Sequence, residues 1–429
     1  MPDVTLVLFH RLSRHDAPPL TTLHARAREI LREHHVALFR RAGVDRVVFV
    51  PGREAQEADA GEAARPAADA ACFGADAGRG GAAPGSFGET LAATVREHRV
   101  AGCIVMGDGA VPLARPSDAA ALVAAARSPL PLALTNNRYS SDVCALSDAG
   151  LLASLPPLPS DNALPRWLEE VAGIPVRELP GRQRLALDLD TPQDLALVAL
   201  ARGCPPPLRS LAAESRLAIP RLDEVRELAR DPHRELLVMG RSSSRTLAWL
   251  ERHARCRVRF LAEERGLRAS SPLAMAVVSP DRAGANARVG TDSPAEANLR
   301  AGANPGAGTG SPAEANLRTD PNARHPRATI GRLIERDGPS SLVRHVGDLA
   351  DGAVLDSRVL LADRLGADEE AWPSPEDRFA SDLLLPDGIE DDWLRALTEA
   401  ALAARIPIVL GGHTLVGPGI PLLLAPERP

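Results

Sequence analysis

Lysine is absent from this sequence, so all 50 basic side chains are arginine. Without lysine the chain cannot form a Schiff base with a carbonyl substrate, and it cannot supply the lysine of a P-loop. Any phosphate that it binds must therefore be held by arginine or by backbone N–H groups.

Aromatic residues are scarce, at 3% of the chain, and the formal net charge is −6. So few rings leave little from which to build a stacking platform for single-stranded nucleic acid. No basic stripe runs along the sequence, which argues against a surface for a nucleic-acid duplex. We expect a small-molecule ligand, with no nucleic acid and no membrane as partner.

Cysteine is rare as well, with five residues at positions 72, 103, 144, 204 and 256 and no C-x-x-C pair. This spacing predicts reduced thiols and no structural zinc site. The start, "MPDVTLVLFHRLSRHD", lacks the apolar run of a signal peptide. The stretch "IPIVLGGHTLVGPGIPLLLAP" has too many prolines and glycines for a spanning helix, and it predicts a buried strand followed by a loop. We expect a cytoplasmic protein.

The length of 429 residues exceeds one ordinary hydrophobic core and predicts two domains. In the first half, strand patterns at 4–9, 45–52, 104–107, 130–137 and 185–190 alternate with helical patterns. This alternation predicts an α/β fold with a mostly parallel sheet and helices on both faces. The prolines of "RGCPPPLRS" (202–210) indicate a boundary between a domain at 1–206 and another at 207–429.

The second half repeats the α/β pattern on a smaller scale, with a strand at 235–241, a serine-capped helix and later strands. An insert at about 270–328 interrupts it, where "GTDSPAEANLR" (290–300) recurs as "GTGSPAEANLR" (308–318). Two copies without a hydrophobic face cannot build a solenoid, so this insert is predicted to be disordered. The Ala-, Gly- and Asp-rich segment 53–84 is predicted to be a flexible loop.

The stretch "LALDLDTPQDLALVALARG" (185–203) carries the most informative motif. In a strand, Asp188 and Asp190 would share one face, and Thr191 would cap a helix that begins at Pro192. Two carboxylates at a strand end suit a hard cation such as Mg²⁺. The alternative is that they only complement the dipole of the following helix.

A second motif, "IVMGDGAVPLARPSDAAALV" (104–123), runs from a strand into Asp108 and then into a helix, with Ser117 as the expected cap. Ligands of open parallel sheets bind beyond the carboxyl ends of the strands, so we expect Asp108 to meet Asp188 and Asp190 at one edge. These three aspartates are the predicted catalytic and metal-binding residues. The alternative for Asp108 is a simple turn, because Asp-Gly is a common turn dipeptide.

The acidic loop with "PL…PSD" and the later "D-x-D-T-P-x-D-L" resemble nucleotidyltransferases of the molybdenum-cofactor guanylyltransferase type, and most of all 2-phospholactate guanylyltransferase. The resemblance covers roughly residues 1–205. It implies a GT-A or Rossmann-like domain that binds an NTP such as GTP. There Mg²⁺ bridges phosphates and carboxylates, and a small phosphorylated acceptor attacks the α-phosphorus and releases pyrophosphate. Asp108 would match the acidic-loop position, and Asp188 or Asp190 the second metal ligand.

The resemblance and the loop positions also suggest substrate-binding residues. In the first loop, "FHRLSRHDAPPL", arginines stand where the family has glycines, an arginine and a lysine, and "GSFGETLAATV" (85–95) matches a Gly-rich turn and helix. Paired asparagines end the strand pattern at 130–137, and their alternative role is turn formation. The six candidates are Arg11, Arg14, Gly85, Gly88, Asn136 and Asn137.

Three other patterns carry weaker signals. The N-terminal histidines lack metalloprotease spacing. "GRSSSR" (240–245) is a helix cap or an anion site, and "GGHTLVGPG" (411–419) lacks G-x-G-x-x-G order and is read as a turn.

Two functional hypotheses follow. One is a Mg²⁺-dependent nucleotidyltransferase; the other is a non-catalytic protein that binds a nucleotide or a phosphorylated metabolite on a degenerate transferase fold.

Overall fold

The computed structural model describes residues 2–11, 16–51, 86–158, 160–263, 326–366 and 368–425. The segment 53–84, predicted to be a flexible loop, lies outside these ranges. So does the predicted insert at about 270–328, except for residues 326–328, which lead into a helix.

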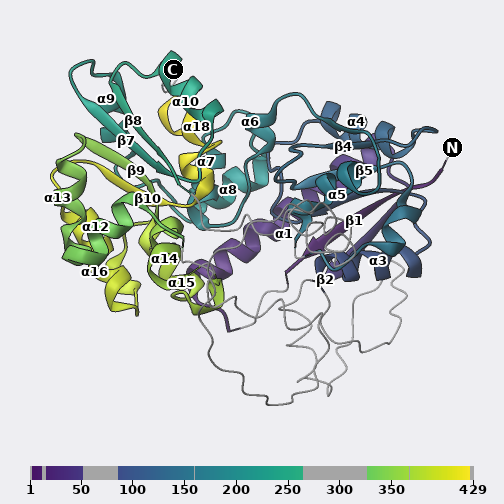
Figure 1. The fold of residues 1–429 in the computed structure, drawn as a ribbon, viewed down its shortest axis with the longest axis horizontal. Coiled ribbons are helices and arrows are strands. Elements are labelled where there is room, and N and C mark those ends of the chain that lie inside the picture. The colour runs from purple at the N-terminus through teal and green to yellow at the C-terminus, as the bar shows by residue number, and fades with distance from the viewer. Residues whose placement is uncertain are drawn as a thin grey trace, which may run out of the picture.

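The first half is built on a mixed sheet of six strands in the order β2-β1-β3-β5-β4-β6 (Figure 1). Strand β5 is antiparallel to both of its neighbours, β3 and β4, and the other pairings are parallel. The α/β class is therefore confirmed. The strands are β1 (Val4–His10), β2 (Arg46–Pro51), β3 (Gly102–Gly107), β4 (Ala133–Thr135), β5 (Val143–Leu146) and β6 (Val176–Glu178).

Both faces of this sheet are buried, because side chains alternate along each strand. In β1, Val7 points into a core formed with α3, η1 and α5, while Leu6 and Leu8 point into a core formed with α1 and α4. The helical segments of this half are α1 (Pro19–Ala42), α3 (Phe87–Glu97), α4 (Pro116–Ala126), η1 (Ala149–Ser154), η2 (Asp161–Ala163), α5 (Leu164–Glu170), α6 (Arg182–Leu185), α7 (Pro192–Ala199) and α8 (Pro206–Glu214).

The second half is built on a four-stranded sheet in the order β10-β9-β7-β8, with every pairing parallel. The strands are β7 (Glu235–Gly240), β8 (Arg257–Ala262), β9 (Gly352–Asp356) and β10 (Ile408–Gly411). Helices α12, α13 and α16 pack on one face, and α9, α10 and α18 on the other. Both halves are thus three-layered α/β units, as the sequence predicts.

The helical segments of the second half are α9 (Leu222–Arg230), α10 (Ser244–His253), α12 (Thr329–Asp337), η5 (Pro339–Ser341), α13 (Leu342–Gly347), α14 (Ser357–Leu365), η6 (Glu369–Ala371), α15 (Pro375–Asp382), η7 (Pro386–Gly388), α16 (Asp392–Ala403), α17 (His413–Val416) and α18 (Ile420–Leu424). The predicted serine cap of α10 is present, because the Ser243 side chain accepts a hydrogen bond from Thr246 N.

Helix α1 joins the two halves. Its first turn lies against the second half, where Leu20 packs beside that core and Glu376 of α15 accepts hydrogen bonds from Leu20 N at 2.9 Å and Thr21 N at 2.8 Å. Further along, Ala27 and Leu31 pack with α7 and α8. Figure 1 shows the helix running from the junction into the first half.

Helix α7 also belongs to both cores. Its Leu195 and Val198 pack with α1 and α8, whereas Ala196 and Leu197 pack among the helices of the second half. Thr191 caps this helix as predicted, with its side chain accepting from Asp194 N. The prolines of 202–210 do not form an extended linker: Pro206 begins α8, whose Leu208 is fully buried.

Three local predictions are wrong. Residues 185–190 form no strand, because α6 ends at Leu185 and only Asp188 makes a bridge, to Ala110. Ser117 does not cap α4, whose helical residues already begin at Pro116. The buried strand predicted before Gly412 is present as β10, but the residues after it are not merely a turn or a loop, because α17 and α18 form there and their apolar side chains close the second core. The short strands β5 and β6 were not predicted.

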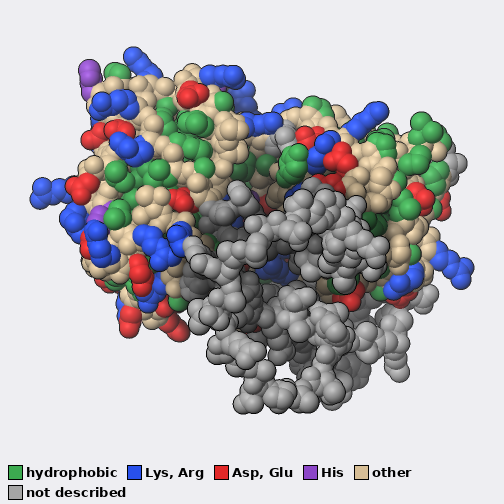
Figure 2. Space-filling view, in the orientation of Figure 1, with side chains coloured by type: hydrophobic (Ala, Val, Ile, Leu, Met, Phe, Trp, Pro, Cys, Tyr) green, Lys and Arg blue, Asp and Glu red, His purple; other side chains and the backbone are tan. Residues whose placement is uncertain are grey.

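The surface shows acidic and basic side chains interspersed over the described residues on the face in Figure 2. Within the described ranges, no helix has the length and apolar character needed to cross a bilayer. Cys103, Cys144, Cys204 and Cys256 are buried free thiols, and Cys72 lies outside the described residues.

Candidate functional site

The carboxyl ends of strands in both sheets meet at residues 188–194. From the first half, the loop after β3 runs beside this segment: Ala110 bridges Asp188, and Leu189 N donates to Gly109 O over 2.9 Å. The two aspartate motifs of the sequence are therefore neighbours in space. The tertiary structure achieves this without the strand that the sequence predicts at 185–190.

From the second half, the ends of β10 and α15 lie against the same segment. Gln193 Nε2 donates to Leu410 O and Asp382 O, both at 2.7 Å, and Thr414 Oγ1 lies 3.5 Å from Asp188 O. Gly411 permits this approach, because a Cβ there would lie 2.2 Å from Gln193 Oε1. We call residues 188–194 with the strand ends on either side the junction site.

Asp108 is almost fully buried, with 2% of its surface exposed, and its carboxylate is bound by Arg28 of α1. Arg28 Nε lies 2.7 Å from Asp108 Oδ1, and the backbone N of Arg11 lies 3.3 Å from Oδ2. The guanidinium thus stands where a cation would bind this carboxylate. In this arrangement Asp108 fastens α1 to the loop after β3.

Asp188 and Asp190 lie on the accessible side of their segment, while Leu187 and Leu189 are buried. No described hydrogen-bond donor reaches the buried Oδ1 of Asp188. Burial, followed by the negative charges of Asp142 and Asp190, raises the pKa of the Asp188 carboxyl well above its usual value. Asp188 Oδ2 lies 3.8 Å from Nε2 of His413, whereas Oδ1 is left without a described donor.

Two further carboxyls, those of Asp142 and Asp161, adjoin this pair and were not among the predicted site residues. Burial and the charge of Asp161 raise the pKa of Asp142 to about 7, and burial raises the pKa of Asp161 to about 6. The Asp142 and Asp188 side chains are within hydrogen-bonding reach of each other. Two carboxyl groups in contact need a shared proton or a bound cation. The sequence signal was the position of Asp142 directly before β5.

Asp190 is exposed and differs from its neighbours. Burial by the surrounding chain would raise its pKa, but the nearby charges of His413 and Arg28 outweigh that effect and lower the pKa. Arg11 acts in the same direction, which places its side chain on this side of the molecule. The Asp190 carboxylate is consequently ionised at neutral pH.

His24 on α1 closes one side of the site. Its Nε2 lies 3.0 Å from Leu189 O, and its ring meets Phe379 of the second half edge-on at 5.2 Å. Burial and the charge of Arg28 lower the pKa of His24 to about 4. The ring is therefore neutral at pH 7, and Nε2–H donates to the Leu189 carbonyl.

The two predicted substrate residues in the asparagine loop, Asn136 and Asn137, make hydrogen bonds within the protein. Asn136 is buried: its Nδ2 donates to Asp142 Oδ2 at 2.6 Å and to Leu185 O at 2.8 Å, and its Oδ1 accepts from Asp142 N. Asn137 Oδ1 accepts from Tyr139 N. Asn136 thus orients Asp142, and Asn137 forms a turn.

Gly88 lies in the first turn of α3, beside the segment 156–158. A Cβ on it would lie 2.2 Å from Pro156 O and 2.6 Å from Leu158 N, so packing alone requires glycine here. The other two predicted substrate residues, Arg14 and Gly85, lie outside the described residues.

Mg²⁺ is the cofactor that the sequence suggests, and the junction site fits it in part. Within the described ranges, no group of three or more His, Cys, Asp or Glu side chains is arranged to hold a metal ion. Mg²⁺ often uses only one or two carboxylates and completes its octahedron with water and substrate phosphates. Two carboxylates are suited to bind Mg²⁺ in this way: Asp188, whose Oδ1 has no described hydrogen-bond donor, and the ionised Asp190.

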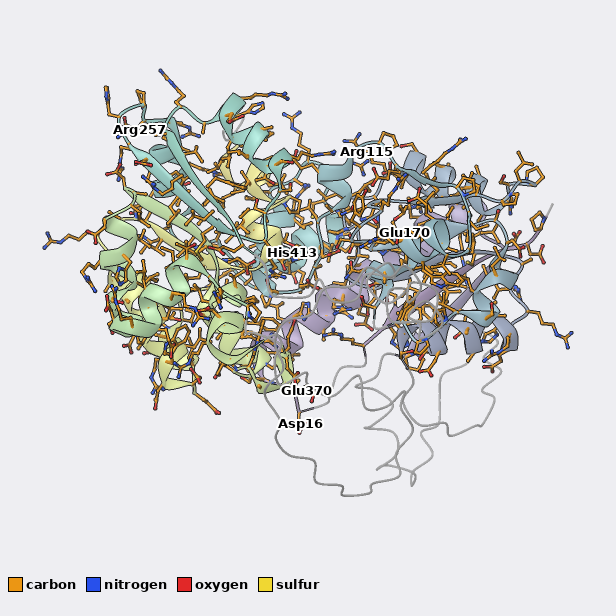
Figure 3. All side chains as sticks on the ribbon, in the orientation of Figure 1. Asp16, Arg115, Glu170, Arg257, Glu370 and His413 are labelled. Carbon is orange, nitrogen blue, oxygen red and sulfur yellow. The ribbon has the colours of Figure 1, made fainter. Side chains whose placement is uncertain are left out.

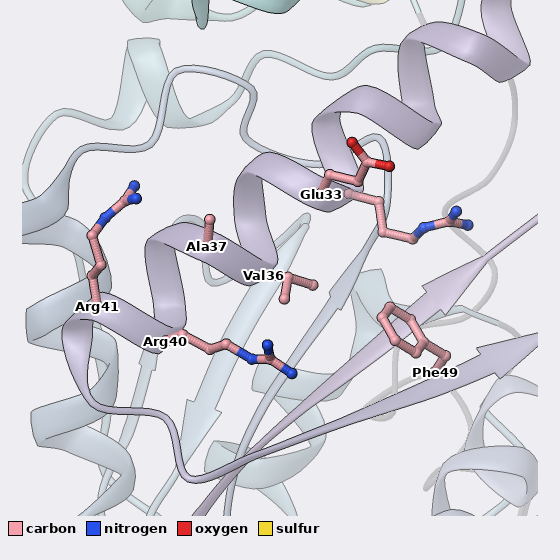
Figure 4. A pocket seen from close by; sticks show the side chains of 7 residues that line it. Glu33, Val36, Ala37, Arg40, Arg41 and Phe49 are labelled. Carbon is pink, nitrogen blue, oxygen red and sulfur yellow. The ribbon is translucent and has the colours of Figure 1, made fainter. Parts of the chain in front are cut away.

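A separate groove of about 570 Å³ lies on the outer side of α1, against strand β2 (Figure 4). It is formed mainly by arginine stems and apolar groups, and it contains none of the junction carboxylates. We assign it no chemistry. Its lining residues are Arg32, Glu33, Val36, Ala37, Arg40, Arg41 and Phe49.

Comparison with known proteins adds no assignment: no protein-family model, no curated protein and no solved structure matches the chain.

Proposed function

We propose that the protein is a Mg²⁺-dependent nucleotidyltransferase that moves an NMP group from an NTP such as GTP to a small phosphorylated acceptor and releases pyrophosphate. The observation that carries the proposal is Asp188, whose buried carboxylate oxygen has no described donor and which adjoins Asp142 and Asp190 at the carboxyl edge of the sheet. This edge is where open α/β sheets bind ligands. The resemblance of "D-x-D-T-P-x-D-L" to the guanylyltransferases supports the same assignment.

Asp188 and Asp190 would hold the ion, which when bound neutralises phosphate charge and orients the triphosphate. Arg11, whose charge already acts on Asp190, would contact the triphosphate. Asp108 and Arg28 would keep α1 in place, a revision of the role that the sequence suggests for Asp108. Asn136 would fix Asp142 beside Asp188.

The test is a calorimetric titration of the full chain with GTP, CTP, ATP and UTP, with and without Mg²⁺. The variant Asp188→Asn with Asp190→Asn should lose the Mg²⁺-dependent part of the affinity, by tenfold or more. The matched control is Asp223→Asn, because the Asp223 side chain on α9 is 85% exposed. If none of the four nucleotides binds the wild type, the proposal fails.

The pairing of Asp108 with Arg28 favours a second candidate, a protein that binds the nucleotide without turnover, because one expected metal-binding carboxylate is already neutralised. Pyrophosphate release separates the two functions. Wild-type protein that binds Mg²⁺ and NTP should release pyrophosphate when a panel of small phosphorylated acids is supplied. Binding without release across the panel would favour the non-catalytic function.

A further inference from the structure

Arg241, directly after β7, is held in a fixed orientation by a buried carboxylate. Its Nε lies 2.6 Å from Asp356 Oδ2, its Nη2 lies 3.0 Å from Asp356 Oδ1, and its backbone N also donates to Oδ2. Asp356 has no exposed surface, whereas the Arg241 side chain is 20% exposed. Two guanidinium nitrogens are thus used inside the protein, and Nη1 has no described hydrogen bond. One edge of the guanidinium is anchored, and the other is available to a ligand.

The position of Arg241 in the sheet is where a ligand is expected. The strand order in the sheet is β10-β9-β7-β8. After β7, the next strand in sequence, β8, lies on one side of β7, and the following strand, β9, lies on its other side. The strand order therefore reverses between β7 and β9, and ligands of open parallel sheets bind beyond the carboxyl ends at such a point. Arg241 and Asp356 are the residues at those two ends. Gly240 lets them approach, because a Cβ on it would lie 2.2 Å from Asp356 Cβ.

His413, the first residue of α17 after β10, links this point to the junction site. Its side chain is 30% exposed, and its Nε2 lies 3.8 Å from Asp188 Oδ2. Its charge also acts on Asp356 and Asp190, so the imidazole lies among carboxylates of both halves. Figure 3 shows His413 between the two halves. Neighbouring side chains thus run from Arg241 through Asp356 and His413 to Asp188. They connect the carboxyl ends of the strands in one half with those in the other.

A reaction with two substrates needs two binding sites that face each other. Here each half contributes one site, at the carboxyl ends of the strands of its sheet. The first half presents carboxylates suited to a cation and its nucleotide. The second half presents the available edge of Arg241 and the imidazole of His413, which are donors suited to an oxyanion. We propose that the second half binds the phosphate group of the acceptor through Arg241 and His413, opposite the nucleotide. This inference rests on the proposed function and assigns the second half its role in it.

The test uses inorganic phosphate as the probe, titrated into the full chain and followed by ³¹P line broadening. Arg241→Gln and His413→Gln should each weaken phosphate binding at least tenfold. Arg257→Gln should leave it unchanged, because Arg257 is exposed on strand β8, away from the junction (Figure 3). Arg241→Gln leaves Asp356 unpaired, so the double variant Arg241→Gln with Asp356→Asn provides a second measurement if the single variant does not fold.

The two proposals fail in different ways. Asp188→Asn with Asp190→Asn should retain phosphate binding while losing Mg²⁺-dependent nucleotide binding, and His413→Gln should show the opposite pattern. Phosphate binding that is lost in Arg11→Gln but kept in the Arg241 and His413 variants would overturn the acceptor site and leave the nucleotide site standing. Wild-type protein that binds Mg²⁺ and nucleotide but no phosphate would overturn it too.

Discussion

Arg28 of α1 binds the buried carboxylate of Asp108 beyond the end of β3, with Arg28 Nε 2.7 Å from Asp108 Oδ1. The pair joins the long helix that spans both halves to the loop that follows the central strand. Its two side chains are 14% and 2% exposed, so solvent screens the interaction little.

Replacing Arg28 by alanine should therefore destabilise the protein strongly. The Asp108 carboxylate would remain buried without its partner, which costs about 3–5 kcal/mol of unfolding free energy. Urea denaturation measures the change. Arg245→Ala, on the exposed side of α10, should alter stability by less than about 0.5 kcal/mol. Equal stability of the two variants would contradict the buried pair.

Thr191→Ala should lower the unfolding free energy by about 1 kcal/mol, because the Thr191 Oγ1 accepts from Asp194 N at the start of α7. Thr191→Ser keeps the hydroxyl, and serine caps helices at least as well as threonine, so this variant should be more stable than Thr191→Ala. Since α7 packs into both cores, fluorescence and circular dichroism should report one common transition. A serine variant as unstable as the alanine variant would show that the cap is not the cause.

His35 should make the protein sensitive to acid. Its ring is fully buried on α1, and burial lowers its pKa to about 3. Below pH 6.5 the His35 imidazole is protonated in the unfolded chain but stays neutral in the folded chain. The unfolding free energy therefore decreases as the pH falls from 6.5 towards 3. At pH 5 the loss is about 2 kcal/mol.

The variant His35→Leu should remove this loss, so its unfolding free energy should change less between pH 7 and pH 5 than that of the wild type. His233→Gln, at an exposed position before β7, should keep the wild-type pH dependence. The measurement is urea denaturation at a series of pH values. An unchanged pH profile in His35→Leu would assign the acid sensitivity to another group.

Glu376→Gln should weaken the connection between the halves. The Glu376 carboxylate accepts from Leu20 N, Thr21 N and Thr21 Oγ1 at the start of α1, where its charge complements the helix dipole. Loss of the charge and of one acceptor oxygen should cost about 1–2 kcal/mol. Glu370→Gln, exposed in η6, is the control in thermal unfolding. A Glu376 variant no less stable than this control would contradict the capping role.

Periodicity alone located most of the regular elements, because local patterns reflect which face is buried. Strands β2 and β3 overlap the strand patterns predicted at 45–52 and 104–107, and the serine-capped helix lies after β7 as predicted. The short strands β5 and β6 escaped prediction because three or four residues carry too little periodicity. Residues 185–190 alternate like a strand, yet they form only one bridge, because their partner Ala110 lies in the loop after β3 and not in a strand.

The sequence by itself determined the α/β class of both halves, the cap at Thr191 and the candidate aspartates, since these depend on residue type and local spacing. Only the tertiary structure decided which charges meet. It paired Asp108 with Arg28, placed Asp142 beside Asp188, and brought His413 from the second half to the same carboxylate. Contacts between residues 80 to more than 200 positions apart depend on how helices pack across two sheets, and no local pattern encodes that geometry.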